Sequence, residues 1–220
     1  MMDKDDLLKL AESGRFITGI YNYCDRWCER CPVTSRCLTF AVTKELCADQ
    51  DSSDIQNATF WQHLADSLRV AGDLLRERAQ ELGVDLDSVT CEERAEEEQR
   101  TEEARNHECC LMAKRYAEMV EVWFESGMAD GKNTGRDGGG VSWQEVTEVI
   151  RWYQHQIYIK LLRAIRSDLE DHTEIGDDIP CDSVAQAKIA LIGIDRSIAA
   201  WDVVRKRLRT PDDEVLDLMV

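Results

Sequence analysis

The chain has very few residues that interrupt a helix. Its 220 residues include three prolines, Pro32, Pro180 and Pro211, and half of its twelve glycines lie between Gly127 and Gly140. Between these interruptions the chain is rich in Leu, Glu, Arg, Ala and Gln, which favour helix over strand. No segment shows the convincing alternation of apolar and polar residues that is typical of a half-buried strand. The sequence therefore predicts an all-α protein.

Helix start and stop signals divide the chain into expected elements. Capping-box patterns at Thr90 and Ser142 mark the starts of two long helices. Long helices joined by mostly short connections favour a bundle. We expect a bundle of about four long helices over residues 58–220, preceded by a cysteine-rich helical segment over residues 1–48. The expected helices cover residues 3–13, 18–31, 35–48, 58–82, 91–126, 142–171 and 182–209.

The charge balance of the chain excludes several classes of partner. Lys and Arg number 27 against 44 Asp and Glu, which gives a net charge of −17. Such a surface repels phosphate backbones and anionic headgroups, so we expect no nucleic acid and no membrane as partner. The start, MMDKDDLLKL, has acids where a signal peptide needs a basic stretch, which favours a cytoplasmic location. In that reducing compartment the nine cysteines are expected to be thiols or metal ligands.

Four of the nine cysteines are clustered in YNYCDRWCERCPVTSRC, residues 21–37. On a helix, Cys24, Cys28 and Cys31 recur at i, i+4 and i+7, so the three sulfurs lie on one face. Pro32 ends such a helix and lets the chain fold back to bring in Cys37. Chance clustering explains this poorly, because the other five cysteines are scattered.

Four converging thiolates match either a tetrahedral zinc site or an iron–sulfur cluster. Structural zinc usually takes two cysteine pairs separated by a longer loop, whereas one compact run supplies all four ligands here. A cysteine followed by proline, as at Cys31, also occurs in bacterial ferredoxins, although the spacing differs. The sequence predicts a [4Fe–4S] cluster held by Cys24, Cys28, Cys31 and Cys37. Zinc is the alternative. In the third interpretation the cysteines bind no metal and either remain thiols or form a disulfide.

A cluster with all four irons held by thiolates transfers electrons or senses redox state instead of binding substrate. The alternative function is a zinc-stapled helical protein-interaction module without catalytic activity. The C-x3-C-x2-C spacing also matches radical S-adenosylmethionine enzymes. We reject that match, because those enzymes resemble a partial (β/α) barrel and leave one iron without a cysteine.

The motif CDRWCERCP, residues 24–32, is similar to one found in certain bacterial proteins. In that respect the chain resembles uncharacterised all-helical bacterial proteins with an N-terminal four-cysteine motif. The resemblance is confined to the N-terminal part of the chain and implies no activity.

The apolar faces of the long helices are expected to line the bundle core. Two of the faces carry charged residues, Arg78 on one helix and Asp195 on another, and buried ions must be paired. We expect an Arg78–Asp195 salt bridge. The alternative is a polar pocket around Asp195 and His155, in which case the protein would be an enzyme. The expected core also includes Leu64, Leu68, Leu75, Leu82, Cys109 and Asp168.

Residues 142–171 carry a second apolar stripe beside their main apolar face. It consists of Trp152, Ile159 and Leu162. A helix exposed on one side needs only one stripe, so this helix is either the most buried or contacts a protein partner or a second copy. A ferritin-like di-iron site is not expected, because no histidine has a glutamate three residues before it.

Overall fold

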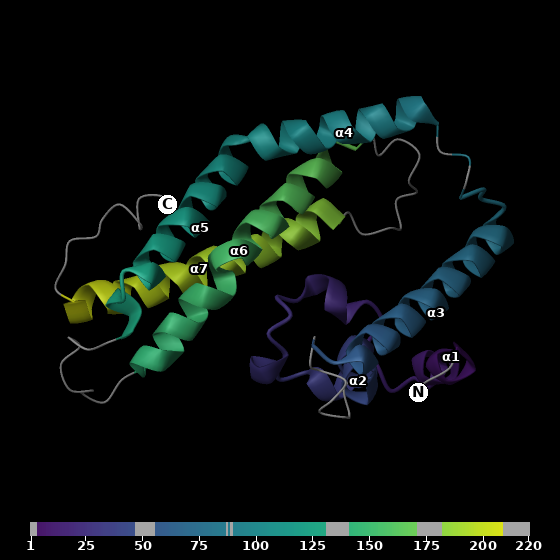
Figure 1. Cartoon of the computed structure of the whole chain (residues 1–220), viewed down its shortest axis with the longest axis horizontal. Helices are drawn as coiled ribbons and strands as arrows, with labels where there is room; N and C mark the ends of the chain where they lie inside the picture. The colour runs from purple at the N-terminus through teal and green to yellow at the C-terminus, as the bar shows by residue number, and fades with distance from the viewer. Residues whose placement is uncertain are drawn as a thin grey trace. The chain divides into compact units, whose positions relative to one another are not determined.

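The computed structural model describes residues 4–46, 56–86, 88, 90–130, 141–170 and 182–208 (Figure 1). Every regular element in these ranges is a helix, which confirms the all-α prediction. None of the described helices is long and apolar enough to cross a membrane. The chain divides into two compact units, Met1–Arg94 and Ala95–Val220, which are described separately below. The predicted domain boundary between residues 48 and 58 stays a prediction.

Three packed helices form the core of the second unit. They are α5 (Glu108–Glu125), α6 (Trp143–Asp168) and α7 (Asp182–Leu208). The middle helix, α6, packs against both others. Most of its predicted main face is buried as expected: Val146, Ile150, Tyr153, Ile157 and Ala164.

Close contact between α6 and α7 depends on small residues of α7. The buried face of α7 includes Ala190, Gly193, Ser197 and Ala200. A Cβ atom built on Gly193 would lie only 2.9 Å from Cδ1 of Tyr153 on α6. The absence of a side chain at Gly193 therefore lets the large Tyr153 ring lie against the α7 backbone.

Aromatic side chains join α7 to α5. The ring centroids of Trp123 and Trp201 are 5.0 Å apart in an edge-to-face arrangement, and Trp123 also lies 6.2 Å from Trp143. The indole Nε1 of Trp201 donates a hydrogen bond of 3.2 Å to the hydroxyl of Tyr116. Burial raises the pKa of the Tyr116 hydroxyl, although this hydrogen bond opposes the shift. The hydroxyl therefore stays protonated at neutral pH.

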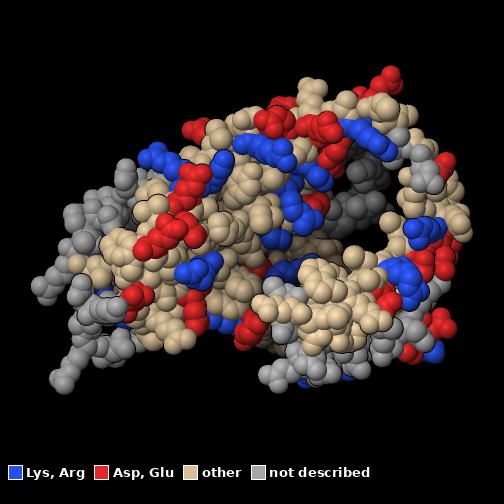
Figure 2. All heavy atoms as spheres, viewed as in Figure 1, with Lys and Arg blue, Asp and Glu red and all other residues tan. Residues whose placement is uncertain are grey.

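The predicted continuous helix over residues 91–126 is wrong, because the chain breaks at His107. The structure has α4 (Cys91–Asn106) followed by α5. His107 adopts an extended conformation and caps α5, since its Nδ1 accepts a hydrogen bond of 3.2 Å from the backbone N–H of Cys109. Acidic and basic side chains are interspersed along α4 (Figure 2). Such a polar helix has no broad apolar face to hold it in line with α5.

Two predictions about core residues are also wrong. Cys109, in the first turn of α5, is exposed, and its neighbour Cys110 is buried instead, on the same face as Ala113 and Val120. Arg78 and Asp195, expected as buried charges in a core, are both exposed. Arg78 pairs with Glu81 at 2.8 Å on the surface of its own helix. Asp168 is also exposed.

The polar groups that are buried in the second unit are neutral. Gln154 on α6 donates hydrogen bonds to the carbonyl oxygen of Ala117 at 3.1 Å and to Oε2 of Glu121 at 2.6 Å, both on α5. Gln186 on α7 accepts from Nζ of Lys160 at 2.9 Å. Buried amides are thus satisfied across both helix interfaces, as burial of polar groups requires.

The first unit has little core of its own. It contains α1 (Lys4–Glu12), α2 (Leu38–Leu46), α3 (Ala58–Leu82) and the first residues of α4. The bounds of α3 match the predicted range of 58–82, and in the structure Asn57 caps its start and Gly83, with φ 69°, ends it. Trp27 and Ala79 are the only hydrophobic residues buried among the described residues of this unit. Leu64, Leu68, Leu75 and Leu82, expected in a core, are exposed.

Candidate metal centre

The four-cysteine segment is built from short turns. The predicted helix over residues 18–31 is wrong. In its place are the 3-10 turns η1 (Ile20–Tyr23) and η2 (Cys28–Arg30), followed by η3 (Thr34–Arg36). A cysteine in extended conformation follows each turn: Cys24, Cys31 and Cys37. The cysteines therefore do not lie on one face of a helix, and the turns position them instead.

Backbone conformations explain why no helix forms here. Gly19 has φ 70°, in the left-handed region. Arg26, between the first two cysteines, has φ 62° and is the one non-glycine residue with positive φ in the described chain. Left-handed conformation disfavours an ordinary side chain by about 1–2 kcal/mol, so the surrounding contacts must hold Arg26 in place. Sequence patterns do not indicate this interruption, because arginine is normally a good helix former.

All four cysteines line one small cavity. Its volume is about 40 Å³. Aromatic and aliphatic side chains make up much of the remaining wall, including Ile20, Tyr21, Trp27, Val33 and Phe40. The structure thus brings together the four residues that the sequence analysis selected and surrounds them with apolar groups.

The charges around this cavity disfavour free thiolates. Burial raises the pKa of the Cys28 thiol above its ordinary value, and four neighbouring groups raise it further: Cys24, Glu29, Cys37 and Cys31. Like charges held close together disfavour ionisation unless a cation is present. A metal ion would supply that positive charge and stabilise the ligands as thiolates.

Local contacts fix individual cysteines. The Sγ of Cys24 donates a hydrogen bond of 3.4 Å to the carbonyl oxygen of Tyr21. Cys37 directly precedes α2, and its carbonyl oxygen accepts the first helical hydrogen bond, of 3.1 Å, from Ala41. The N-terminus of a helix favours negative charge, which suits a ligand thiolate at this position.

Trp27 covers the cavity from one side. It is 8% exposed, and the guanidinium carbon of Arg30 lies 4.2 Å from its ring centroid. Its backbone N–H donates a hydrogen bond of 3.1 Å to Oδ1 of Asp25. The indole ring of Trp27 is therefore held by the contact with Arg30, and its backbone is held by the hydrogen bond to Asp25.

The four cysteines are not arranged in a metal-binding geometry in this structure. Within the described ranges, no group of three or more His, Cys, Asp or Glu residues is placed so that it could hold a metal ion. The four cysteines are free thiols that share a cavity. Metal binding would have to draw their sulfurs together.

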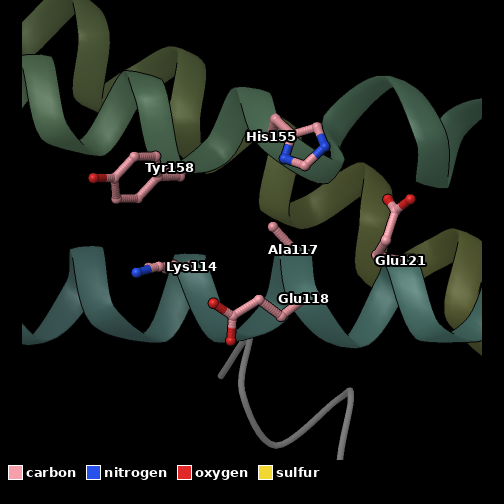
Figure 3. Close-up of a pocket in the computed structure, with 6 residues that line it drawn as sticks. All are labelled: Lys114, Ala117, Glu118, Glu121, His155 and Tyr158. Atoms are coloured by element: carbon pink, nitrogen blue, oxygen red, sulfur yellow. The ribbon is translucent and has the colours of Figure 1, made fainter.

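A second concave region lies between α5 and α6 (Figure 3). This groove has a volume of about 500 Å³ and is lined by Lys114, Ala117, Glu118 and Glu121 from α5 and by His155 and Tyr158 from α6. His155 thus lies near two glutamates that the sequence analysis did not select. Asp195, its expected partner, does not line the groove. Within the described residues these groups form no metal-ligand set.

The other described cysteines, Cys91, Cys109 and Cys110, line neither region. Cys91 and Cys109 are exposed and Cys110 is buried. Cys47 and Cys181 lie outside the described residues. Comparison of the chain with protein-family models, curated proteins and solved structures finds no match.

Proposed function

We propose that residues 24–37 bind a metal centre through Cys24, Cys28, Cys31 and Cys37, and that this centre is a [4Fe–4S] cluster used for electron transfer or redox sensing. One observation carries the proposal: all four cysteines line the same apolar cavity. Four soft sulfur ligands in one place select zinc or iron–sulfur centres over metals that prefer oxygen.

The scarcity of core in the first unit supports a stabilising metal. Trp27 and Ala79 alone are buried hydrophobic residues in its described part. Units with so little buried apolar surface usually need a metal, a disulfide or a partner subunit to stay folded. Metal binding contributes directly to folding where the free ligands do not hold the site together.

The apolar wall of the cavity supports a redox role for that metal. Side chains such as Trp27 and Phe40 would keep water from a bound cluster, and solvent exposure is one of the properties that set its reduction potential. Four cysteine ligands leave no iron open to a substrate. The cluster would take up and release one electron without making or breaking a bond to another molecule.

A zinc-stapled interaction module is the second candidate, and the size of the cavity favours it. A volume of about 40 Å³ is small, since a cavity needs roughly 10–15 Å³ to hold a single water molecule. A single zinc ion would therefore require smaller movements of the four sulfurs than a cluster would. In that case the metal would only stabilise the segment.

A pair of cysteine variants tests the proposal. Cys28→Ser removes a ligand, whereas Cys109→Ser removes an exposed thiol outside the cavity and serves as the matched control. After anaerobic purification, Cys28→Ser should lose visible absorption and bound iron, while Cys109→Ser should keep both. Far-ultraviolet circular dichroism should show the long helices intact in both variants.

The outcomes separate the two candidates. Loss of one zinc per chain in Cys28→Ser, with no visible colour in the wild type, would establish the zinc module and exclude the redox role. Equal metal content in wild type and Cys28→Ser would overturn the ligand assignment.

The metal site does not depend on three other expectations, which stay predictions. They are the bundle of about four long helices, the partner surface at Trp152, Ile159 and Leu162, and the cytoplasmic location.

A further inference from the structure

A row of exposed residues runs along the whole length of α3. Its members recur at alternating intervals of three and four, which is the spacing of the a and d positions of a coiled coil. We call this row the α3 seam: Trp61, Leu64, Leu68, Ala71, Leu75, Arg78 and Leu82.

The α3 seam is exposed at every position. The tryptophan and the four leucines are between 40% and 65% exposed, and Ala71 and Arg78 are also exposed. Residues on another side of the helix, such as His63, Ser67 and Val70, are half-buried. A row of exposed leucines at coiled-coil spacing marks an interaction surface.

The charge pattern of the seam decides which partner fits. In a parallel pair of α3 helices, equivalent positions face each other, so Arg78 would face a second Arg78 and Ala71 would face a second Ala71. The first contact is repulsive and the second leaves a void. A parallel self-pairing is therefore disfavoured.

An antiparallel pair removes both problems. When a positions face d positions of the partner, Leu64 faces Leu75, and Leu68 faces Ala71. In the same register Arg78 lies against Trp61 of the second copy, where a guanidinium and an indole attract each other. The helix macrodipoles are also opposed, which is favourable.

The positions that flank the seam carry few charges. On one side they are Ala65, Gly72 and Ala79, of which Ala79 is already buried in the single chain. On the other, Glu81 is the single charged residue beside the seam, and it forms an ion pair with Arg78 of the same helix. Neither flank brings like charges together in the antiparallel pair.

We propose that the α3 seam is a homodimer interface, in which α3 helices of two copies pack as an antiparallel coiled coil. This dimer would use a different surface from the predicted stripe on α6. It would bury the leucines that the first unit leaves exposed. The inference does not depend on the metal centre.

The oligomeric state of the full chain tests the interface. Analytical ultracentrifugation should give twice the chain mass of 25.2 kDa for the wild type. Leu68→Glu places a carboxylate in the middle of the seam in both copies and should weaken the dimer by at least about a hundredfold. Gln80→Glu adds the same charge at an exposed position off the seam and should leave the dimer unchanged.

Loss of the dimer in Leu68→Glu counts only if the variant is folded. Leu68 is exposed in the single chain, so its circular dichroism spectrum should match that of Gln80→Glu. A monomeric wild type at high micromolar concentration would overturn the proposal. A dimer equally stable in both variants would also overturn it, because the interface would then lie elsewhere.

A cross-linking experiment tests the orientation. Trp61→p-benzoylphenylalanine places a photoreactive group at one end of the seam. In the antiparallel dimer, peptide mapping should find the cross-link near Arg78 of the second copy. Cross-links near Trp61 of the second copy would show a parallel pair and refute the proposed register.

Discussion

Replacing Gly193 by alanine tests how α6 and α7 pack. The added Cβ would lie 2.9 Å from Cδ1 of Tyr153 and 3.2 Å from Cγ1 of Ile157. Both neighbours are buried side chains in the middle of α6 and have little room to move. Overpacking of this kind destabilises a core by about 1–3 kcal/mol, while alanine gains roughly 0.5–1 kcal/mol in helix propensity over glycine. Gly193→Ala should therefore lower the free energy of unfolding by about 1–2 kcal/mol.

Gly72 supplies a matched control for this substitution. It also lies inside a long helix, but the nearest atom to an added Cβ is Nη1 of Arg76 at 3.6 Å, the end of a flexible side chain. Gly72→Ala should therefore stabilise α3 by about 0.5–1 kcal/mol through helix propensity alone. The two substitutions are chemically identical, so their opposite signs would come from packing.

Urea denaturation provides the assay. Four of the six tryptophans lie in the second unit, so tryptophan fluorescence reports mainly on that unit, and circular dichroism reports on all helices. The two units need not unfold together, so the transitions are fitted separately. If Gly193→Ala is as stable as the wild type or more stable, the close packing of Tyr153 against α7 is wrong.

Four further predictions concern individual residues. Burial raises the pKa of Cys110 to about 11 from 9.0. The stability that its protonated thiol contributes is therefore present below pH 9 and decreases by about 2 kcal/mol as the pH rises to 11. In Cys110→Ala the free energy of unfolding should depend less on pH over this range. In the folded protein a maleimide should label Cys109 quickly and Cys110 only after unfolding, and equal rates would contradict the assigned register. Arg26→Gly should slow hydrogen exchange of the cysteine segment relative to Arg26→Ala, by the equivalent of about 1 kcal/mol, because glycine adopts φ 62° without strain. Gln154→Glu places a carboxylate beside Glu121 and should destabilise the second unit by about 3 kcal/mol at pH 7, with recovery on acidification; an unchanged urea midpoint would refute the buried amide contacts.

The sequence predicted helix ends well where the signal is local. Asn57 and Gly83 bound α3 as expected. The capping box at Ser142 and Glu145 is formed, with the Glu145 backbone N–H 3.1 Å from Oγ of Ser142. Caps depend on residues three or four apart, so a single sequence contains the information that specifies them.

Predictions of register and burial depended on information that is not local. On α5 the buried cysteine is Cys110, which shares a face with Ala113, whereas Cys109, expected on that face, is exposed. On α7 the buried face contains small residues such as Gly193 and Ser197, which a search for large apolar residues does not select. Asp195 was therefore assigned to the wrong face. Tertiary packing decided these positions.

The candidate site was predictable in its members but not in its backbone. The spacing of the cysteines selected the same four residues that line the cavity. The helix expected to align them does not form, since Arg26 adopts a left-handed conformation that its residue type does not indicate. The four cysteines that share the cavity are thus indicated by composition and spacing, whereas the turns that place them are not.

The most direct test of the metal centre is the iron, zinc and acid-labile sulfide content of the wild-type chain, purified without oxygen, together with its visible spectrum. We predict about four irons and four sulfides per chain and broad thiolate-to-iron absorption that is bleached by a one-electron reductant. One zinc per chain without visible absorption would support a metal site at the four cysteines but contradict the redox role. A chain that contains neither metal, with the thiols of Cys24, Cys28, Cys31 and Cys37 all freely reactive, would contradict the central claim.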